Sequence, residues 1–266
     1  MNTQYLEHEN GQIAYDESGS GPLVVCVPSM GDLRAEYRLL TPQLTAAGFR
    51  VVCMDVRGHG ESSTAWGDFS VAGVGSDILA LIQKMDSRPA LILANSMAAG
   101  AAVWAAAEAP QMIKGMILID PFVRGETNFL ARLFYAALLQ RPWGAAMWAV
   151  YYNTLYPTRK PADFSAYRAA LRANLQQPGR VEALGQMMYA SKSASEQRLT
   201  RVTSPALVLM GSKDPDFKQP ETEAAWLAGQ LKTRYEMIPN AGHYPHAEMP
   251  EVCAPLILNF FNSLIV

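Results

Sequence analysis

The chain has 266 residues, of which 50% are hydrophobic and 17% are charged, and its formal net charge at pH 7 is −2. This composition excludes a disordered chain, which has few apolar residues and a high net charge, and a chain of this length buries a core without a disulfide or a metal. No run of like charges stands out in the sequence, so we expect no nucleic-acid partner that binds through phosphate contacts.

Strand and helix signals alternate along most of the chain. The first half predicts a hairpin of strands at Tyr5–His8 and Gln12–Ser18, a strand at Leu23–Val27, a helix at Ala35–Ala47, a strand at Phe49–Asp55, a helix at Val71–Met85, a strand at Ala90–Ala94, a helix at Ser96–Ala109 and a strand at Ile113–Ile119. The last part predicts a strand at Ala206–Met210, a helix at Glu221–Leu231, a strand at Arg234–Ile238 and a helix at Pro250–Leu264. Strands separated by helices imply parallel βαβ units. We therefore predict an α/β fold with a mostly parallel, doubly wound sheet and an antiparallel hairpin at its N-terminus.

The alternation stops between Phe122 and Thr203, where helical patterns occur without a strand. A connection of this length in a compact fold is usually a functional insertion. We therefore expect a helical cap at 122–203 on a core formed by 1–121 and 204–266. The aromatic and methionine side chains of the cap either line a pocket or form its own core, and we take Trp143 and Trp148 as candidate substrate contacts.

Ser96 stands where the predicted strand Ala90–Ala94 gives way to a helix. Ligands of open parallel sheets bind at the carboxyl ends of the strands. A serine on a sharp strand-to-helix turn projects its hydroxyl above the sheet, and small residues two positions before and after it, here Ala94 and Ala98, let the backbones approach. Ser96 is therefore a candidate nucleophile, although serine is also a common helix N-cap.

Acids and histidines follow the ends of later strands. Asp214 and His243 each come directly after a predicted parallel strand, and they give the chain order Ser, Asp, His. A histidine can act as the base for a serine nucleophile, and a carboxylate can hold the imidazole in the required tautomer. Asp216 and Asp120 remain alternative acids, and His246 is the alternative base.

Four motifs in the right order resemble the α/β-hydrolase superfamily over essentially the whole chain. They are the elbow Asn95-Ser96-Met97, the DxRGxGxS segment Asp55-Val56-Arg57-Gly58-His59-Gly60-Glu61-Ser62, the acid loop Gly211–Asp214, and Gly242-His243 followed by Glu248-Met249-Pro250. The resemblance implies the α/β-hydrolase fold, with Ser96, Asp214 and His243 as the catalytic residues.

The resemblance also implies an oxyanion hole made by the backbone N–H groups of Met30 and Met97. The sequence departs from the family at Pro28-Ser29, where His-Gly is usual, but Met30 keeps its N–H. Ser29 is a candidate hydroxyl donor to substrate or a serine that bonds locally in its loop. A second departure is alanine for glycine around the elbow, at Ala94 and Ala98.

The predicted function is hydrolysis of a small, largely apolar carboxylic ester through an acyl-enzyme, without a cofactor or a metal. Haloalkane dehalogenases and epoxide hydrolases of this fold are excluded, because they need an aspartate where Ser96 stands. A rival prediction is a carbon–carbon bond hydrolase of a vinylogous diketone acid, whose acid the cap residues Arg124, Arg132 and Arg141 would bind. A perhydrolase is a second rival. A third, from a different class of protein, is a small-molecule receptor or signalling module with slow or no turnover.

The expected location is cytoplasmic. The first residues lack a basic segment followed by an apolar stretch, which predicts no signal peptide. The apolar runs are far shorter than the roughly 18 residues of a membrane span. Cys26, Cys53 and Cys253 form no CxxC pair, which is typical of reduced core cysteines. The expected partner is a small-molecule substrate, with no membrane partner, and the oligomeric state is left open.

Overall fold

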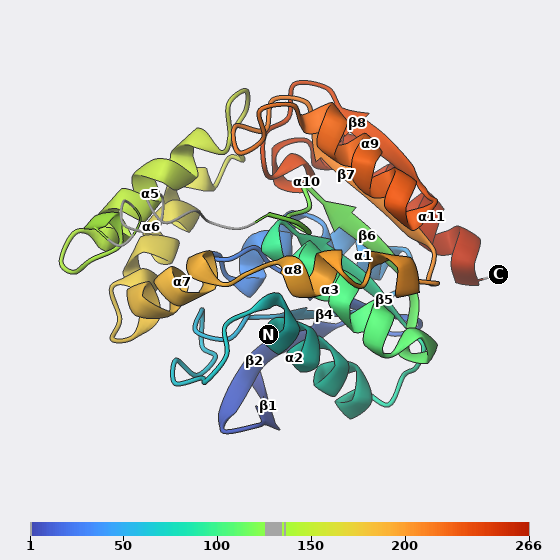
Figure 1. Ribbon diagram of the computed structural model, residues 1–266, viewed down its shortest axis with the longest axis horizontal. Coiled ribbons are helices and arrows are strands. Elements are labelled where there is room, and N and C mark those ends of the chain that lie inside the picture. Colours follow the sequence, from blue (N-terminus) through green and yellow to red (C-terminus); the bar gives the residue numbers. More distant parts are fainter. Residues whose placement is uncertain (1, 126–134, 136, 266) are drawn as a thin grey trace.

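A single mixed sheet forms the centre of the molecule. The computed structural model describes residues 2–125, 135 and 137–265 (Figure 1). The eight strands of the sheet run in the order β1-β2-β4-β3-β5-β6-β7-β8. Their bounds are β1 Gln4–His8, β2 Gly11–Ser18, β3 Leu23–Val27, β4 Arg50–Met54, β5 Ala90–Asn95, β6 Ile113–Ile119, β7 Ala206–Gly211 and β8 Arg234–Ile238. The pairs β1–β2 and β2–β4 are antiparallel and the other pairs are parallel, which confirms the predicted sheet and its N-terminal hairpin.

Helices cover both faces of this sheet. Successive side chains of a strand point to opposite faces, so in β3 Val25 and Val27 join the core under α2 (Val71–Lys84), α3 (Met97–Glu108) and α9 (Pro220–Leu231). Val24 and Cys26 join the core under α1 (Thr41–Ala46) and α11 (Pro250–Ile265). Because both faces are buried, polar groups of the parallel strands are free to act only at the strand ends.

The predicted helix at Ala35–Ala47 is wrong in its form. The structure has a 3-10 helix at Arg34–Leu39 followed by the short helix α1, which begins at Thr41. Pro42 explains the break, because proline has no N–H to donate and is tolerated only in the first turn of a helix.

The segment between β6 and β7 holds its own small core. Its described helices are α5 Gly144–Thr154, α6 Phe164–Leu175, α7 Arg180–Tyr189 and α8 Ser193–Glu196. In Figure 1, α5 and α6 lie to one side of the sheet, while α8 packs on α2 and α3. Residues of α5, α6 and α7 cluster with Tyr244 and Ala247, which follow β8. The segment is thus packed against the chain that leaves the last strand of the sheet.

No helix in the described part of the chain is both long enough and apolar enough to cross a membrane.

The DxRGxGxS segment makes buried hydrogen bonds that hold the turn after β4. Asp55 accepts hydrogen bonds from the backbone N–H groups of Arg34 (2.7 Å) and Glu61 (3.0 Å). Arg57 is fully buried and forms two parallel hydrogen bonds of 2.8 Å with the buried carboxylate of Asp77 in α2. A bidentate pair of this kind is strong and fixes its geometry. The motif therefore joins the turn after β4 to α2.

We expect Asp77→Ala to lower the free energy of unfolding by about 3–5 kcal/mol, because it leaves a buried guanidinium without its carboxylate. Urea denaturation followed by circular dichroism measures the change. Glu182→Ala is the matched control, since its pair with Arg141 is about half exposed on both sides and should contribute less than about 1 kcal/mol. A loss in Asp77→Ala no larger than in this control would contradict the role given to the buried pair.

Candidate active site

Ser96 sits on a strained turn between β5 and α3. Its backbone has φ 57° and ψ −124°, a region that costs a non-glycine residue about 1–3 kcal/mol. Two hydrogen bonds hold the turn: the Ser96 N–H donates to Ile119 O (2.8 Å) and the Phe122 N–H donates to Ser96 O (3.0 Å). Ser96 occupies the N-cap position of α3, but its side chain makes no capping hydrogen bond.

Alanine is accommodated on both sides of the turn. Ala94 and Ala98 are both completely buried, and the turn still has its positive φ. The two backbones approach closely at Gly100 of α3, because an added Cβ there would lie 2.7 Å from Phe122 O. The departure from glycine at Ala94 and Ala98 therefore leaves the sharp turn intact.

His243 is paired with Asp214. His243 follows β8, Asp214 follows β7, and Nδ1 of the imidazole lies 2.6 Å from Oδ2 of the carboxylate, with both side chains buried. Burial disfavours the charged forms of both His243 and Asp214, but the attraction between the two groups outweighs this effect. The attraction therefore raises the pKa of His243 above its ordinary value and lowers the pKa of Asp214. Among the described residues no hydrogen bond joins Ser96 Oγ to the imidazole, and such contacts are often long before substrate binds.

The alternative acid Asp216 and the alternative base His246 have other partners. The Asp216 carboxylate is 4.0 Å from His243 Nδ1 and accepts the Tyr151 hydroxyl at 2.5 and 2.6 Å. His246 is buried, with Nε2 3.1 Å from the Glu36 carboxylate. Neither residue therefore competes for the contact between His243 and Asp214.

Asp120, the third candidate acid, lies beside this pair. Its Oδ1 accepts the Gly211 N–H at 2.9 Å, and one carboxylate oxygen each of Asp120 and Asp214 and one ring nitrogen of His243 all lie within 4.8 Å of one another. Burial, and then the charge of Asp214, raise the pKa of Asp120 well above its ordinary value, which favours its protonated form. These residue types could hold a metal, but the 2.6 Å contact already joins two of the ligand atoms to each other.

Two residues from different parts of the chain offer backbone N–H groups near the elbow. Met30 follows β3, Met97 begins α3, and both line the cavity described below. In the part of the chain that the structure describes, neither N–H donates to a protein acceptor. The N-terminus of a helix also favours negative charge. The pair could therefore bind an oxyanion.

A buried glutamate and a tryptophan hold the Met30 loop. Glu36 accepts the Ser29 N–H at 2.8 Å, and the Trp148 indole N–H donates to Gly31 O at 2.9 Å. Gly31 has φ +72°, and a Cβ there would lie 2.3 Å from the Trp148 ring. The Ser29 hydroxyl donates within the loop, to Met30 O at 3.4 Å. Ser29 thus bonds locally and is absent from the cavity lining.

Glu248 explains the motif that follows His243. Its carboxylate accepts three backbone N–H groups, from Gly242 at 2.7 Å, Thr158 at 3.0 Å and Arg159 at 2.7 Å. The loop is also tied to the elbow, because the Asn95 side chain donates to His243 O at 3.2 Å. These contacts fix the position of His243 relative to Ser96.

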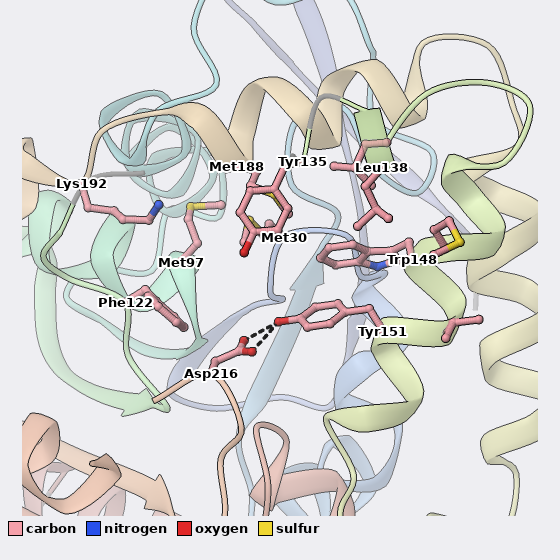
Figure 2. Close-up of a pocket in the computed structure, with 13 residues that line it drawn as sticks. Met30, Met97, Phe122, Tyr135, Leu138, Trp148, Tyr151, Met188, Lys192 and Asp216 are labelled. Atoms are coloured by element: carbon pink, nitrogen blue, oxygen red, sulfur yellow. Dashed lines mark hydrogen bonds between the residues drawn. The ribbon is translucent and has the colours of Figure 1, made fainter. Parts of the chain in front are cut away.

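An apolar cavity of about 510 Å³ opens over Met30 and Met97. Figure 2 shows Trp148 and Tyr151 entering it from one helix, with the Tyr151 hydroxyl directed at Asp216. The lining residues are Met30, Met97, Phe122, Tyr135, Leu138, Leu139, Met147, Trp148, Val150, Tyr151, Met188, Lys192 and Asp216. Sequence reasoning counted Tyr151 only among the aromatic side chains of the cap, and it missed Lys192. The helical spacing of Tyr151, three residues after Trp148, was a usable signal, whereas nothing in the sequence marks Lys192.

The other described cap candidates are absent from the cavity lining. Trp143 is 49% exposed, and its indole N–H donates to Ala137 O, so its proposed substrate contact is not supported. Arg124 pairs with Glu223 and Arg141 pairs with Glu182. Arg132 lies outside the described residues. The described arginines are therefore neutralised by glutamates and do not line the cavity.

Known proteins resemble this chain over nearly its whole length. The family model of the alpha/beta hydrolase fold matches residues 22–250. The 2-(acetamidomethylene)succinate hydrolase of Mesorhizobium japonicum is 26% identical over 93% of this chain and 90% of that protein. An esterase of Thermogutta terrifontis has a TM-score of 0.85 at 21% identity over all of both chains. The enol-lactonase of Burkholderia xenovorans has a TM-score of 0.83 at 20% identity over 97% of this chain and all of that one. The chain therefore belongs to the alpha/beta hydrolase fold family.

Proposed function

We propose that this protein hydrolyses small, largely apolar carboxylic esters through an acyl-enzyme, with Ser96 as nucleophile. The observation that carries the proposal is the 2.6 Å contact between His243 Nδ1 and Asp214, because a buried carboxylate on Nδ1 leaves Nε2 free to take a proton. The esterase and lactonase among the similar structures support the same reaction class.

In the proposed reaction Ser96 Oγ attacks the ester carbonyl carbon while His243 Nε2 takes the hydroxyl proton. The carbonyl oxygen becomes an oxyanion that accepts the N–H groups of Met30 and Met97. The carbon–oxygen bond to the alcohol then breaks, and His243 returns the proton to the leaving alcohol. A water molecule gives its proton to His243 and attacks the acyl carbon. The free acid leaves, and Ser96 regains its proton.

The carbon–carbon hydrolase prediction rests on the resemblance of the elbow Asn95-Ser96-Met97 to that subfamily, with three cap arginines as candidate ligands for the acid. Two of these arginines, Arg124 and Arg141, pair with glutamates and give the prediction no support. The receptor prediction requires a burst and then slow turnover of p-nitrophenyl acetate. The proposed esterase predicts steady turnover after the first equivalent.

We expect a serine-directed fluorophosphonate to add one equivalent to the wild type and none to Ser96→Ala, because only an activated hydroxyl attacks it. Mass spectrometry of the intact protein measures the adduct. Ser29→Ala is the matched control, since this serine is buried in the adjoining loop and its loss should leave labelling intact. Labelling of Ser96→Ala at the wild-type rate would end the assignment.

Three asparagine variants separate the candidate acids. Asp214→Asn should lose about 10⁴ in kcat, as loss of the acid does in a related triad. Asp120→Asn should lose far less, because Asp214 and not Asp120 makes the 2.6 Å contact with His243, and an amide oxygen can still accept the Gly211 N–H. Asp216→Asn should also lose far less. Steady-state kinetics with p-nitrophenyl butyrate gives the order, and an Asp120→Asn variant that is folded yet more impaired than Asp214→Asn would contradict it.

The pH dependence of the same variants tests the cause. A raised His243 pKa means that the imidazole stays protonated, and inactive as a base, to a higher pH. In the wild type kcat/KM should therefore rise with pH through a midpoint above the ordinary histidine value of 6.5. Asp214→Asn removes the negative charge and should move that midpoint down. An unmoved midpoint would show that Asp214 does not set the His243 pKa.

We also propose that residues 122–203 act as a cap. Trp148 and Tyr151 of α5 and Met188 of α7 line the cavity opposite Met30 and Met97 of the core. Each buried CH₂ of substrate contributes up to ~0.8 kcal/mol, about fourfold in affinity. We expect kcat/KM to rise along a series of p-nitrophenyl esters of short to medium chain length and then to fall, with little activity on emulsified triglyceride. A flat series together with good triglyceride activity would contradict the cap.

A further inference from the structure

Lys192 is a buried cation in the wall of the cavity. It lies between α7 and α8, is only 8% exposed, and lines the cavity. Figure 2 shows its ammonium nitrogen directed at Met97, the residue after Ser96. Lysine is almost never buried to this extent without a partner.

No described residue of opposite charge pairs with the ammonium. Within the described ranges no hydrogen bond or ion pair involves the Lys192 side chain, and burial alone lowers its pKa from the ordinary value. Its neighbours in the lining include Met97 and Phe122, whose side chains have no group that can accept a hydrogen bond strongly. An unpaired charge in such surroundings is costly, and an anion bound beside the ammonium would offset that cost.

Asp216, the other charged residue of the lining, does not fill that place. Figure 2 shows it apart from Lys192 and beside Tyr151, whose hydroxyl donates to both carboxylate oxygens at 2.5 and 2.6 Å. Among the described lining residues, the negative charge of Asp216 thus has a hydrogen-bond donor, while the positive charge of Lys192 has no partner. An anionic group of a substrate would be repelled from the side of Asp216 and attracted to Lys192.

We propose that Lys192 binds a carboxylate of the substrate, so that the substrate is an ester or lactone that carries a free acid group apart from the bond that is cleaved. This inference rests on the proposed ester hydrolysis. A single lysine matches a group with one negative charge, whereas a phosphate carries more charge and usually gathers several donors. The apolar remainder of the cavity accommodates the carbon chain between the acid and the ester.

Two esters of equal length test the proposal. One is the mono-p-nitrophenyl ester of glutaric acid, which ends in a carboxylate, and the other is p-nitrophenyl pentanoate, which ends in a methyl group. The ratio of their kcat/KM values should favour the carboxylate in the wild type. It should fall by about tenfold to a hundredfold in Lys192→Met, the range that a hydrogen bond to a charged group supplies.

Two further variants serve as controls. Lys192→Arg keeps the charge and should keep most of the preference. Lys160→Met removes an exposed lysine elsewhere on the cap and should leave the ratio at the wild-type value. An equal ratio in the wild type and Lys192→Met, or a wild type that prefers pentanoate, would overturn the proposal.

A binding measurement separates this proposal from the esterase proposal. In the Ser96→Ala background, monomethyl glutarate should raise the thermal unfolding midpoint more than methyl pentanoate does, and Lys192→Met should abolish the difference. If neither p-nitrophenyl ester is hydrolysed but this difference is present, the ester hydrolysis fails while the carboxylate site stands. If the esters are hydrolysed and the difference is absent, the carboxylate site fails alone.

Discussion

The strained backbone of Ser96 is the constraint on which the rest of the site depends. A positive φ at a serine persists only where the surroundings hold it, and here they also fix the distances between the site residues. The Ile119 carbonyl and the Phe122 N–H hold the elbow to β6. The amide of Asn95 donates to both Ile119 O and His243 O at 3.2 Å. The contacts that stabilise the strain are thus the same contacts that place His243 beside the elbow.

Buried carboxylates position the loops around this elbow. Glu36 accepts the Ser29 N–H, Glu248 accepts the Gly242 N–H, and Asp120 accepts the Gly211 N–H. A buried N–H without a partner costs about 1–3 kcal/mol, so each loop is held where its carboxylate satisfies it. Several acids look like catalytic groups in the sequence. In the structure one of them pairs with His243, and the others accept hydrogen bonds from backbone N–H groups of the loops.

The sequence predicted the sheet well, because strands that are buried on both faces consist of unbroken runs of apolar residues. It could not separate Asp214 from Asp216, since residues two apart in a loop are equally close to a strand end. It also could not separate Trp143 from Trp148. Five positions in a helix turn the side chain well away from its starting face, whereas Trp148 and Tyr151 share a face. Lys192 was missed because its importance depends on which charges are absent around it, and only the structure shows that.

The arrangement of charge in the cavity also bears on the end of the proposed reaction. Hydrolysis of the acyl-enzyme creates a new carboxylate next to His243, close to Asp214 and Asp216. Like charges at such distances repel, and Asp216 lies within 4.0 Å of the imidazole. The new acid is therefore destabilised at the point where it forms, while an acid group already present on the substrate is held at Lys192. Lys192 would thus attract the acid group that the substrate already carries. Asp216 would repel the carboxylate that the reaction creates and so favour its release.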